Sequence, residues 1–283
     1  MRRFEPRSEE RIAMVSKKIF RVFLYLTLLF AIAFQPLQAV LAETEGSTIA
    51  NVSSSAINLL LPTNTQDNSH PQEILPPKDP ANIVYLTFDD GPDPEWTIQI
   101  LNILECYQAG ATFYMVGCNV VSYPEIVREV ASRGQTIAIH GFNHVDLSGV
   151  GYGYFYNEIH DTETAIMEAL GEDQALIQQF GRCMRPPYGK RGNLLEINAE
   201  TMGYEVSMWN IDTKDWLGLS PEEILTHIRA SLEPQKVILM HYAGLDRSNT
   251  SRALELILHE LLMQGYTVLP YCTREGQAIK TSD

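Results

Sequence analysis

Two adjacent acidic residues, Asp89 and Asp90, stand where an apolar segment ends. The residues before them, 83–88, are rich in β-branched and aromatic side chains, and Gly91-Pro92 after them prevents a strand from continuing. Two neighbouring carboxylates repel each other unless a cation offsets their charge. The pair therefore indicates either a turn, in which Asp, Gly and Pro are common, or a metal site in which one carboxylate binds the cation and the other handles protons.

The second group consists of two histidines, His140 and His144, separated by a short segment that begins with Gly141. A helix would align imidazoles four residues apart, but the preceding apolar run and the glycine favour a loop after a strand. Two imidazoles and one carboxylate leave an open position on a divalent ion, which is the pattern of catalytic zinc. The alternative is a pair of hydrogen-bonded loop histidines.

A third segment carries one cation on a rigid turn, from Arg185 through two prolines to Tyr188 and Gly189. Proline removes backbone donors at two positions and leaves the Tyr188 N–H free for a ligand. The segment is either an ordinary proline-rich loop or a site in which Arg185 neutralises one of the paired acids and Tyr188 donates to an oxyanion.

Aromatic and acidic residues are mixed in the segment from Trp209 to Trp216, which includes Asp215. Tryptophan rings at the mouth of a site stack on sugars, although burial is their usual fate. Farther along, His241 follows an apolar run. It is either a hydrogen-bonded core residue or, with a carboxylate such as Asp215 beside it, a tuned acid or base.

Strands and helices alternate in the part of the chain that carries these groups. The predicted strands are 83–88, 111–116, 135–139, 204–208, 237–240 and 266–269, and the predicted helices are 95–108, 124–132, 157–170, 194–202, 221–232 and 252–263. Such βα repeats predict a parallel sheet or barrel. Because Asp89, His140, the segment from Trp209 and His241 each follow a predicted strand, we expect them to meet at one barrel mouth.

The first 42 residues differ from the rest. Seven basic and three acidic residues precede an apolar run at 22–34, and small residues suited to cleavage follow at 40–42. The short apolar run rises about 20 Å as a helix, less than the roughly 30 Å hydrocarbon core, whereas 22–42 would span it. We therefore expect an export signal, either cleaved or retained as a membrane anchor, with the rest of the chain secreted or in the cell envelope.

Length and composition fit one folded domain of about 200 residues with appendages, since the 283 residues are 45% hydrophobic and 20% charged. The net charge of −14 excludes nucleic acid as an expected partner. Four cysteines permit up to two disulfides, with three pairings, in oxidising surroundings; buried free thiols are the alternative. The four are Cys106, Cys118, Cys183 and Cys272.

Taken in order, the chemical segments resemble the polysaccharide deacetylases of the NodB-homology type, carbohydrate esterase family 4. The segments that carry the resemblance are 87–92, 140–144, 185–189, 212–216 and 239–241. The resemblance implies an α/β fold, a distorted (β/α) barrel of about seven units. It also implies a divalent metal, usually zinc with Co²⁺, Ni²⁺ or Mn²⁺ as alternatives, bound by Asp90, His140 and His144.

The resemblance also implies the catalytic roles. Asp89 would be the general base, oriented by Arg185, and His241 the general acid, with Asp215 fixing its tautomer. The backbone N–H of Tyr188 would bind the oxyanion. Trp216 would pack near the acetyl methyl group. From their residue types, Tyr188 and Trp209 are also predicted to contact the substrate.

Several positions depart from the family pattern. Gly141 stands where Ser or Thr is usual, so a hydroxyl that stabilises the histidine loop is missing. The segment 135–139 differs from the usual His-Glu-Ile-Gly-Asn, Val145 replaces a usual Pro, and Tyr242 replaces a common Asp. None of these changes removes an expected catalytic group, but they bear on metal affinity and substrate preference.

These observations predict a signal or anchor at 1–42, a flexible linker at 43–80, a deacetylase catalytic domain at 81–273 and a tail at 274–283. The predicted function is metal-dependent removal of N-acetyl groups from a polysaccharide with N-acetylglucosamine, such as peptidoglycan or a chitin-like polymer. The alternatives are an O-acetyl esterase acting on xylan or another glycan, and a non-catalytic glycan-binding module.

Overall fold

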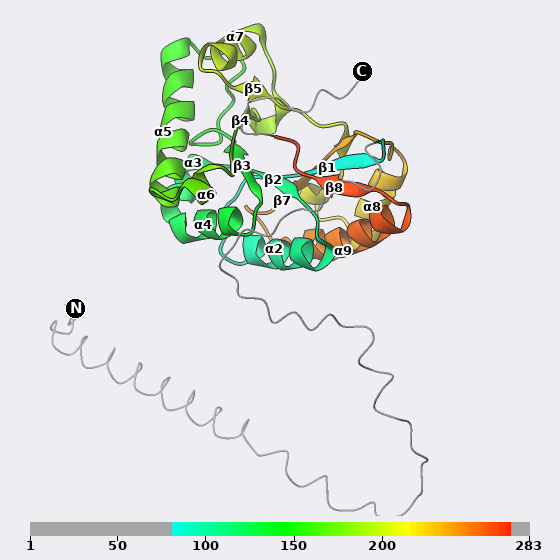
Figure 1. The fold of residues 1–283 in the computed structure, drawn as a ribbon. Coiled ribbons are helices and arrows are strands. Elements are labelled where there is room, and N and C mark those ends of the chain that lie inside the picture. Colours follow the sequence, from blue (N-terminus) through cyan, green and yellow to red (C-terminus); the bar gives the residue numbers. More distant parts are fainter. Residues whose placement is uncertain (1–80, 273–283) are drawn as a thin grey trace, which may run out of the picture. The chain divides into compact units, whose positions relative to one another are not determined.

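A parallel eight-stranded sheet forms the centre of a computed structural model, which describes residues 81–272 (Figure 1). The strands are β1 (Ile83–Asp89), β2 (Ala111–Met115), β3 (Thr136–Ile139), β4 (Phe180–Met184), β5 (Glu205–Val206), β6 (Ile211–Asp212), β7 (Val237–His241) and β8 (Thr267–Leu269). Seven of them follow the order β5-β4-β3-β2-β1-β7-β6, and β8 pairs with the first half of β1. The predicted distorted barrel of about seven units is confirmed as a curled half-barrel.

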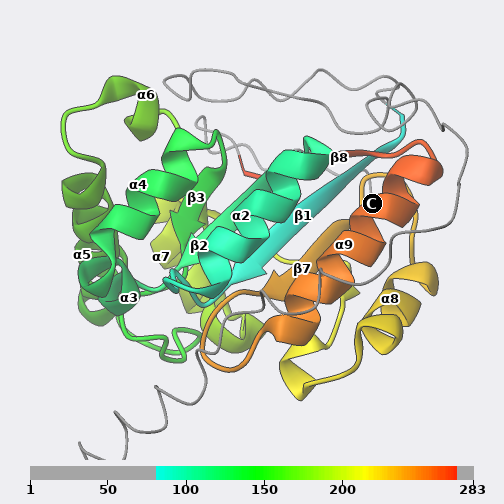
Figure 2. The same cartoon turned by 90° about the horizontal axis from the view of Figure 1, so that it is seen from below.

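Helices cover this sheet (Figure 2). They are α2 (Trp96–Tyr107), α3 (Gly117–Ser122), α4 (Pro124–Ser132), α5 (Tyr152–Leu170), α6 (Gln174–Ile177), α7 (Asn193–Thr201), α8 (Pro221–Arg229) and α9 (Ser248–Met263), with short 3-10 turns η1 (Pro187–Gly189) and η2 (Asp215–Leu217). Helices α4, α2 and α9 lie side by side across one face. No helix within residues 81–272 is long and apolar enough to cross a bilayer. The predicted leader and linker, and the tail after residue 273, lie outside the described residues.

The apolar character of β1 follows from its central place. All of its residues after Ile83 are buried, because it has neighbours on both edges and side chains packed on both faces. The rings of Phe88 and Phe113 stack at 5.2 Å, and Tyr242 packs edge-on against Phe113 at 5.1 Å. A rigid aromatic core therefore lies under the strand end that carries Asp89.

Most predicted elements are confirmed, with boundaries that differ by a few residues. A capping box begins α8: Ser220 Oγ accepts from Glu223 N, and the Glu223 carboxylate accepts from Ser220 N. Strands β4 and β6 and helices α3 and α6 are not predicted from the sequence. Helix α5 begins five residues earlier than predicted, because Gly151 and Gly153 are typical of a loop.

One disulfide joins Cys183 on β4 to Cys272 after β8, across 89 residues of sequence. Cys106 and Cys118 are exposed and free, so one of the pairings that the sequence left open is present and a second bridge is not formed between the described cysteines. The bond holds the last described residue against the sheet, since Cys183 and Cys272 are both buried. Oxidising surroundings are the conditions in which such a bond persists.

We expect Cys272→Ser to lower the free energy of unfolding by about 2 to 5 kcal/mol, because it opens a long loop in the unfolded chain. Urea denaturation of the oxidised protein measures the change. Cys106→Ser is the matched control and should leave the midpoint unchanged. A midpoint for Cys272→Ser equal to that of the control would show that the disulfide contributes nothing to stability.

Candidate active site

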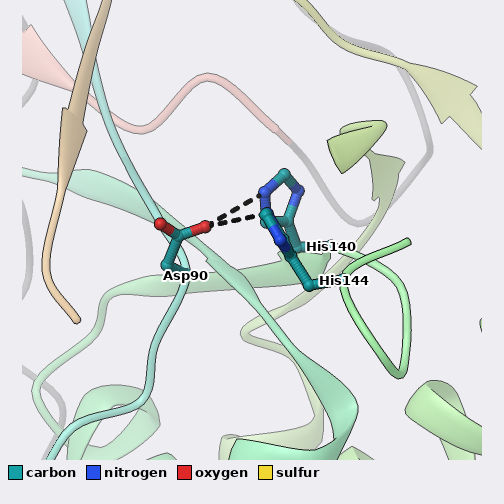
Figure 3. A group of neighbouring side chains, drawn as sticks. All are labelled: Asp90, His140 and His144. Atoms are coloured by element: carbon teal, nitrogen blue, oxygen red, sulfur yellow. Dashed lines mark ion pairs between the residues drawn. The ribbon is translucent and has the colours of Figure 1, made fainter. Parts of the chain in front are cut away.

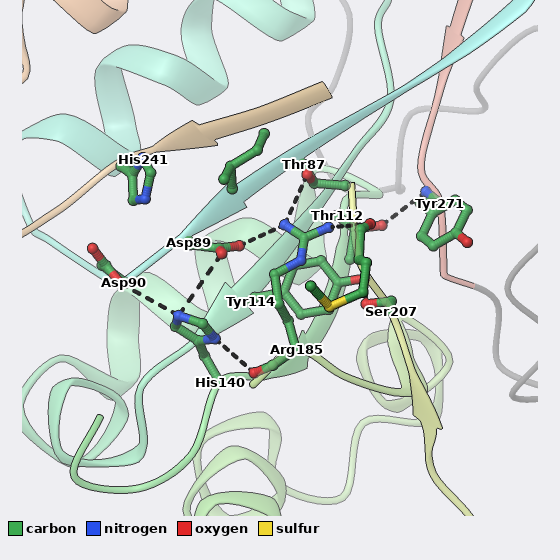
Figure 4. A network of polar contacts seen from close by, with 12 residues as sticks. Thr87, Asp89, Asp90, Thr112, Tyr114, His140, Arg185, Ser207, His241 and Tyr271 are labelled. Atoms are coloured by element: carbon green, nitrogen blue, oxygen red, sulfur yellow. Dashed lines mark hydrogen bonds and ion pairs between the residues drawn. The ribbon is translucent and has the colours of Figure 1, made fainter. Parts of the chain in front are cut away.

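The polar side chains gather at the carboxyl ends of adjacent parallel strands. Asp89 is the last residue of β1 and pairs in register with His241, the last residue of β7. His140 directly follows β3, and Arg185 directly follows β4. Figure 4 shows Asp89, Asp90, His140 and Arg185 in contact across these strand ends, with His241 beside the two acids. Residues separated by as much as 152 positions thus form one site, as the strand pattern predicted.

Asp90, His140 and His144 form a group that could hold a metal ion (Figure 3). One Asp90 carboxylate oxygen, Oδ1, lies 3.4 Å from His140 Nε2 and 3.2 Å from His144 Nε2. The potential ligand atoms of all three residues lie within 4.8 Å of one another. One carboxylate oxygen and two imidazole nitrogens are the donors of an open zinc site, so this group fits a divalent cation.

The protonation states of this group also suit a cation. His140 Nδ1 lies 2.8 Å from the carbonyl oxygen of Arg185, which only accepts hydrogen bonds, so Nδ1 is a donor and Nε2 is the ring nitrogen that can offer a lone pair to a cation. Burial raises the pKa of Asp90, but hydrogen bonds with His140 and His144 and the charges of His140 and His241 outweigh this effect and hold that pKa well below its usual range. Asp90 is therefore ionised and ready to bind a cation.

Arg185 and Asp89 form a buried ion pair. Arg185 Nη1 donates to Asp89 Oδ1 at 2.8 Å and to Thr87 Oγ1 at 2.9 Å, and its guanidinium lies 4.1 Å from the centre of the Tyr114 ring. Both side chains are almost completely shielded from solvent. The other oxygen of Asp89, Oδ2, faces His140 Nε2 at 3.8 Å. Arg185 thus fixes one oxygen of Asp89 and leaves the other directed toward the metal-ligand group.

His241 and Asp215 form a second pair. His241 Nδ1 lies 2.8 Å from Asp215 Oδ1, and the His241 backbone N–H donates to Asp215 Oδ2 at 2.8 Å. Thr213 and Thr250 also donate to the same carboxylate. Burial lowers the pKa of His241, but the hydrogen bond and charge of Asp215 outweigh it, so that pKa is raised. The other ring nitrogen of His241, Nε2, is left free on the side of Asp89 and Asp90.

The three predicted substrate-contacting aromatics differ in placement. Tyr188 packs its ring edge against His144 at 4.6 Å, donates its hydroxyl to the His144 carbonyl at 3.1 Å, and is 64% exposed. Trp216 is 47% exposed on η2. Trp209 is instead half-buried, with its ring against Gly189 and 5.5 Å from the Arg185 guanidinium. Tyr188 and Trp216 are open to a ligand, whereas Trp209 supports the proline turn.

Comparison with known proteins agrees with this geometry. The family described as polysaccharide deacetylase matches residues 77–207. A peptidoglycan-N-acetylglucosamine deacetylase of Bacillus cereus is 34% identical over 186 residues, which cover 65% of this chain and 84% of the relative. The chain belongs to the polysaccharide deacetylase family.

Two further relatives of this deacetylase-family chain have related names. The solved structure of the Bc1960 peptidoglycan N-acetylglucosamine deacetylase, bound to a naphthyl N-hydroxybenzamide, superposes with a TM-score of 0.61 at 31% identity; the match covers 66% of this chain and 85% of the other. A chitooligosaccharide deacetylase of Bradyrhizobium is 29% identical, over 66% of this chain and 88% of the relative.

Other groups in this deacetylase-family site were missed by sequence reasoning. Thr87, Thr213 and Thr250 each donate to a site residue or to the strand beside it, but threonine is too common in strands and helices to stand out. Glu158, buried on α5, accepts three hydrogen bonds from the histidine loop. An acid on the buried face of an amphipathic helix was the available signal, because such residues are seldom buried without partners.

Two departures from the family pattern have a clear structural setting. Gly141 has a φ of +77°, a left-handed conformation that favours glycine. Tyr242 is fully buried, and its ring packs so closely on Gly91 that no side chain fits there. The Tyr242 hydroxyl has no hydrogen-bond partner among the described residues. Tyr242 therefore fills space beneath the acid pair and supplies no carboxylate to the site.

Proposed function

We propose that this chain is an exported, metal-dependent hydrolase that removes N-acetyl groups from a polysaccharide containing N-acetylglucosamine. The observation that carries the proposal is the Asp90–His140–His144 group, flanked by a charge-paired carboxylate and a histidine of raised pKa. This arrangement supplies a cation site, a base and an acid within one strand-end cluster. The relatives are named for peptidoglycan and chitooligosaccharides, and both are polymers of this sugar type.

A divalent cation, zinc by its donor set, would be held by Asp90, His140 and His144 and would activate water and polarise the acetamide carbonyl. Asp89 accepts the proton of the attacking water through Oδ2, because Arg185 occupies its other oxygen. His241 then donates a proton to the departing amine nitrogen, held in the required tautomer by Asp215.

The remaining residues bind and orient the substrate. Tyr188 has a φ of +61° directly after two prolines, a conformation that supports donation of its N–H to the developing oxyanion. Trp216, exposed beside Asp215, packs against the acetyl methyl group. Trp209 acts indirectly, by supporting the turn that carries Tyr188.

The reaction is tested by acetate release from chitooligosaccharides and from peptidoglycan in parallel, with chelator-treated protein before and after addition of Zn²⁺ or Co²⁺. We expect release that returns with metal, and the responding substrate identifies the polymer. Release from acetylated xylan alone would identify an O-acetyl esterase. Glycan binding that persists under chelation, with no release under either metal, would identify a binding module.

We expect Asp215→Asn to move the alkaline limb of the pH dependence of kcat/KM to lower pH. The general acid must be protonated, so activity falls as pH rises through the pKa of His241. That pKa lies above the ordinary value of histidine in the native protein, since the hydrogen bond and charge of Asp215 outweigh the effect of burial. Asp215→Asn removes the negative charge beside His241, while burial still lowers the pKa of His241. His241 therefore loses its proton at lower pH in the variant.

Asp212→Asn is the matched control for this prediction, because Asp212 lies in the same segment and accepts from Lys214 N rather than from His241. Its pH profile should coincide with that of the native enzyme. A limb that stays in place in Asp215→Asn would show that His241 is not the acid.

Export is supported by the basic and apolar leader and by the disulfide between Cys183 and Cys272. The leader is either cleaved near residue 42 or retained as an anchor, and a linker at 43–80 then separates it from the catalytic domain. The N-terminal mass of protein isolated from the envelope or medium distinguishes the two. Protein found only in the cytoplasm, with its leader intact, would refute export.

A further inference from the structure

The metal-ligand loop is clamped by one buried carboxylate. Glu158 Oε2 accepts the backbone N–H of Phe142 at 2.8 Å and that of Asn143 at 2.9 Å. Its other oxygen, Oε1, accepts from the Asn143 side chain at 2.7 Å. Glu158 is only 4% exposed and lies on the inner face of α5. Both of its oxygens are thus occupied by the segment between the two histidine ligands.

The opposite side of the loop is held by the start of α3. The N–H of Gly117 donates to the Gly141 carbonyl at 2.9 Å, and that of Cys118 donates to the Phe142 carbonyl at 3.0 Å. The amides of the loop therefore point to Glu158 while its carbonyls point to α3. Two independent elements fix the peptide planes that lead from His140 to His144.

The loop needs such a clamp because of its backbone. Gly141 has a φ of +77° and His144 a φ of +52°, and left-handed conformations are costly for residues other than glycine. Gly141 also carries no hydroxyl that could hydrogen-bond within the loop. A carboxylate that accepts three hydrogen bonds supplies this restraint from outside the loop, and charge-assisted bonds are stronger than neutral ones.

We propose that Glu158 is a positioning residue for the metal site: its carboxylate holds the 141–143 backbone so that His140 and His144 face Asp90 before any cation arrives. The inference rests on the metal site of the proposed function and adds to it a residue distant from the strand ends. Groups that orient metal ligands contribute about 10- to 100-fold to metal affinity. Glu158 therefore sets how tightly the chain holds its cation.

The test compares Glu158→Ala and Glu158→Gln with the native protein. Zn²⁺ affinity is measured by competition with a chromophoric chelator, well below the unfolding temperature. Hydrogen exchange of the Phe142 and Asn143 amides is followed in the metal-free protein. We expect the alanine variant to bind Zn²⁺ about 10- to 100-fold more weakly and to exchange both amides faster. Excess Zn²⁺ should restore most of kcat, since no reacting group is removed.

Glu168→Ala is the matched control, because Glu168 lies exposed on the same helix, and its Zn²⁺ affinity should equal that of the native protein. If Glu158→Ala does not fold, the Zn²⁺ affinity of Glu158→Gln decides the test, since glutamine keeps one acceptor oxygen but loses the charge. Affinity within twofold of native in a folded variant would overturn the proposal. Native protein that binds Zn²⁺ but releases no acetate would overturn the reaction alone, and native protein that binds no Zn²⁺ would overturn both.

Discussion

Asp90→Ala should bind no stoichiometric Zn²⁺ and should release acetate at a rate indistinguishable from the buffer. The variant removes the single carboxylate from a three-residue ligand set, and a catalytic cation supplies both the activated water and the polarised carbonyl. We expect the two remaining histidines to bind the cation too weakly to retain it. Metal content by atomic absorption and acetate release at saturating substrate measure the two effects.

The informative comparison is with His241→Ala. General acid catalysis contributes about 10² to 10⁴ in rate, so this variant should keep its metal and a weak, measurable activity. His241 also lies outside the ligand group, and its Nδ1 is bonded to Asp215. Equal residual rates in two folded variants, both with metal bound, would show that Asp90 and His241 do not have the distinct roles assigned to them.

Arg185→Met should lower the free energy of unfolding by about 3 to 5 kcal/mol and also remove most activity. The guanidinium is completely buried and donates to both Asp89 and Thr87, so its loss leaves a buried carboxylate without a cation. That same carboxylate is the proposed base, and without Arg185 neither its charge nor its orientation is fixed. Urea denaturation and acetate release follow the two consequences separately.

Arg182→Met is the control, since Arg182 lies on β4, three residues before Arg185. Its ion pair with Glu163 is partly exposed, and such pairs contribute about 0 to 1 kcal/mol. We expect a small change in stability and none in activity. A similar loss of stability in the two variants would show that replacing any arginine in or beside β4 is destabilising. Loss of the buried ion pair would then not explain the effect of Arg185→Met.

The fold was predictable where a clear pattern of apolar residues or a helix-start signal marks the element. Strand β1 is buried along nearly its whole length, so its sequence is an apolar run. The start of α8 is marked by Ser220 and Glu223, which form its capping box. Strand β4 was missed because Gly181 and the exposed Arg182 interrupt its apolar pattern. The tertiary position of β4 between β3 and β5, and its disulfide, decide its conformation.

The candidate site was predictable where its chemistry falls at strand ends. Asp89, His140 and His241 were brought together by the expectation that parallel strands end at one edge, and the structure places them there. The hydrogen-bond partners of these residues were harder to predict from the sequence. Glu158 reaches the loop across 15 or 16 residues, and Thr250 reaches Asp215 across 35, and no local pattern marks such pairs.

The place of β1 in the sheet also constrains how the domain forms. This first strand is hydrogen-bonded to β2, but also to β7 and β8, which lie about 150 and 180 residues later in the chain. Such distant pairings make folding slow, because much chain entropy must be lost before they form. During synthesis, β2 is the one described strand neighbour available to β1 until β7 has been made. The acid pair at its end is thus among the first chemical groups of the domain to be synthesised and among the last to reach its place.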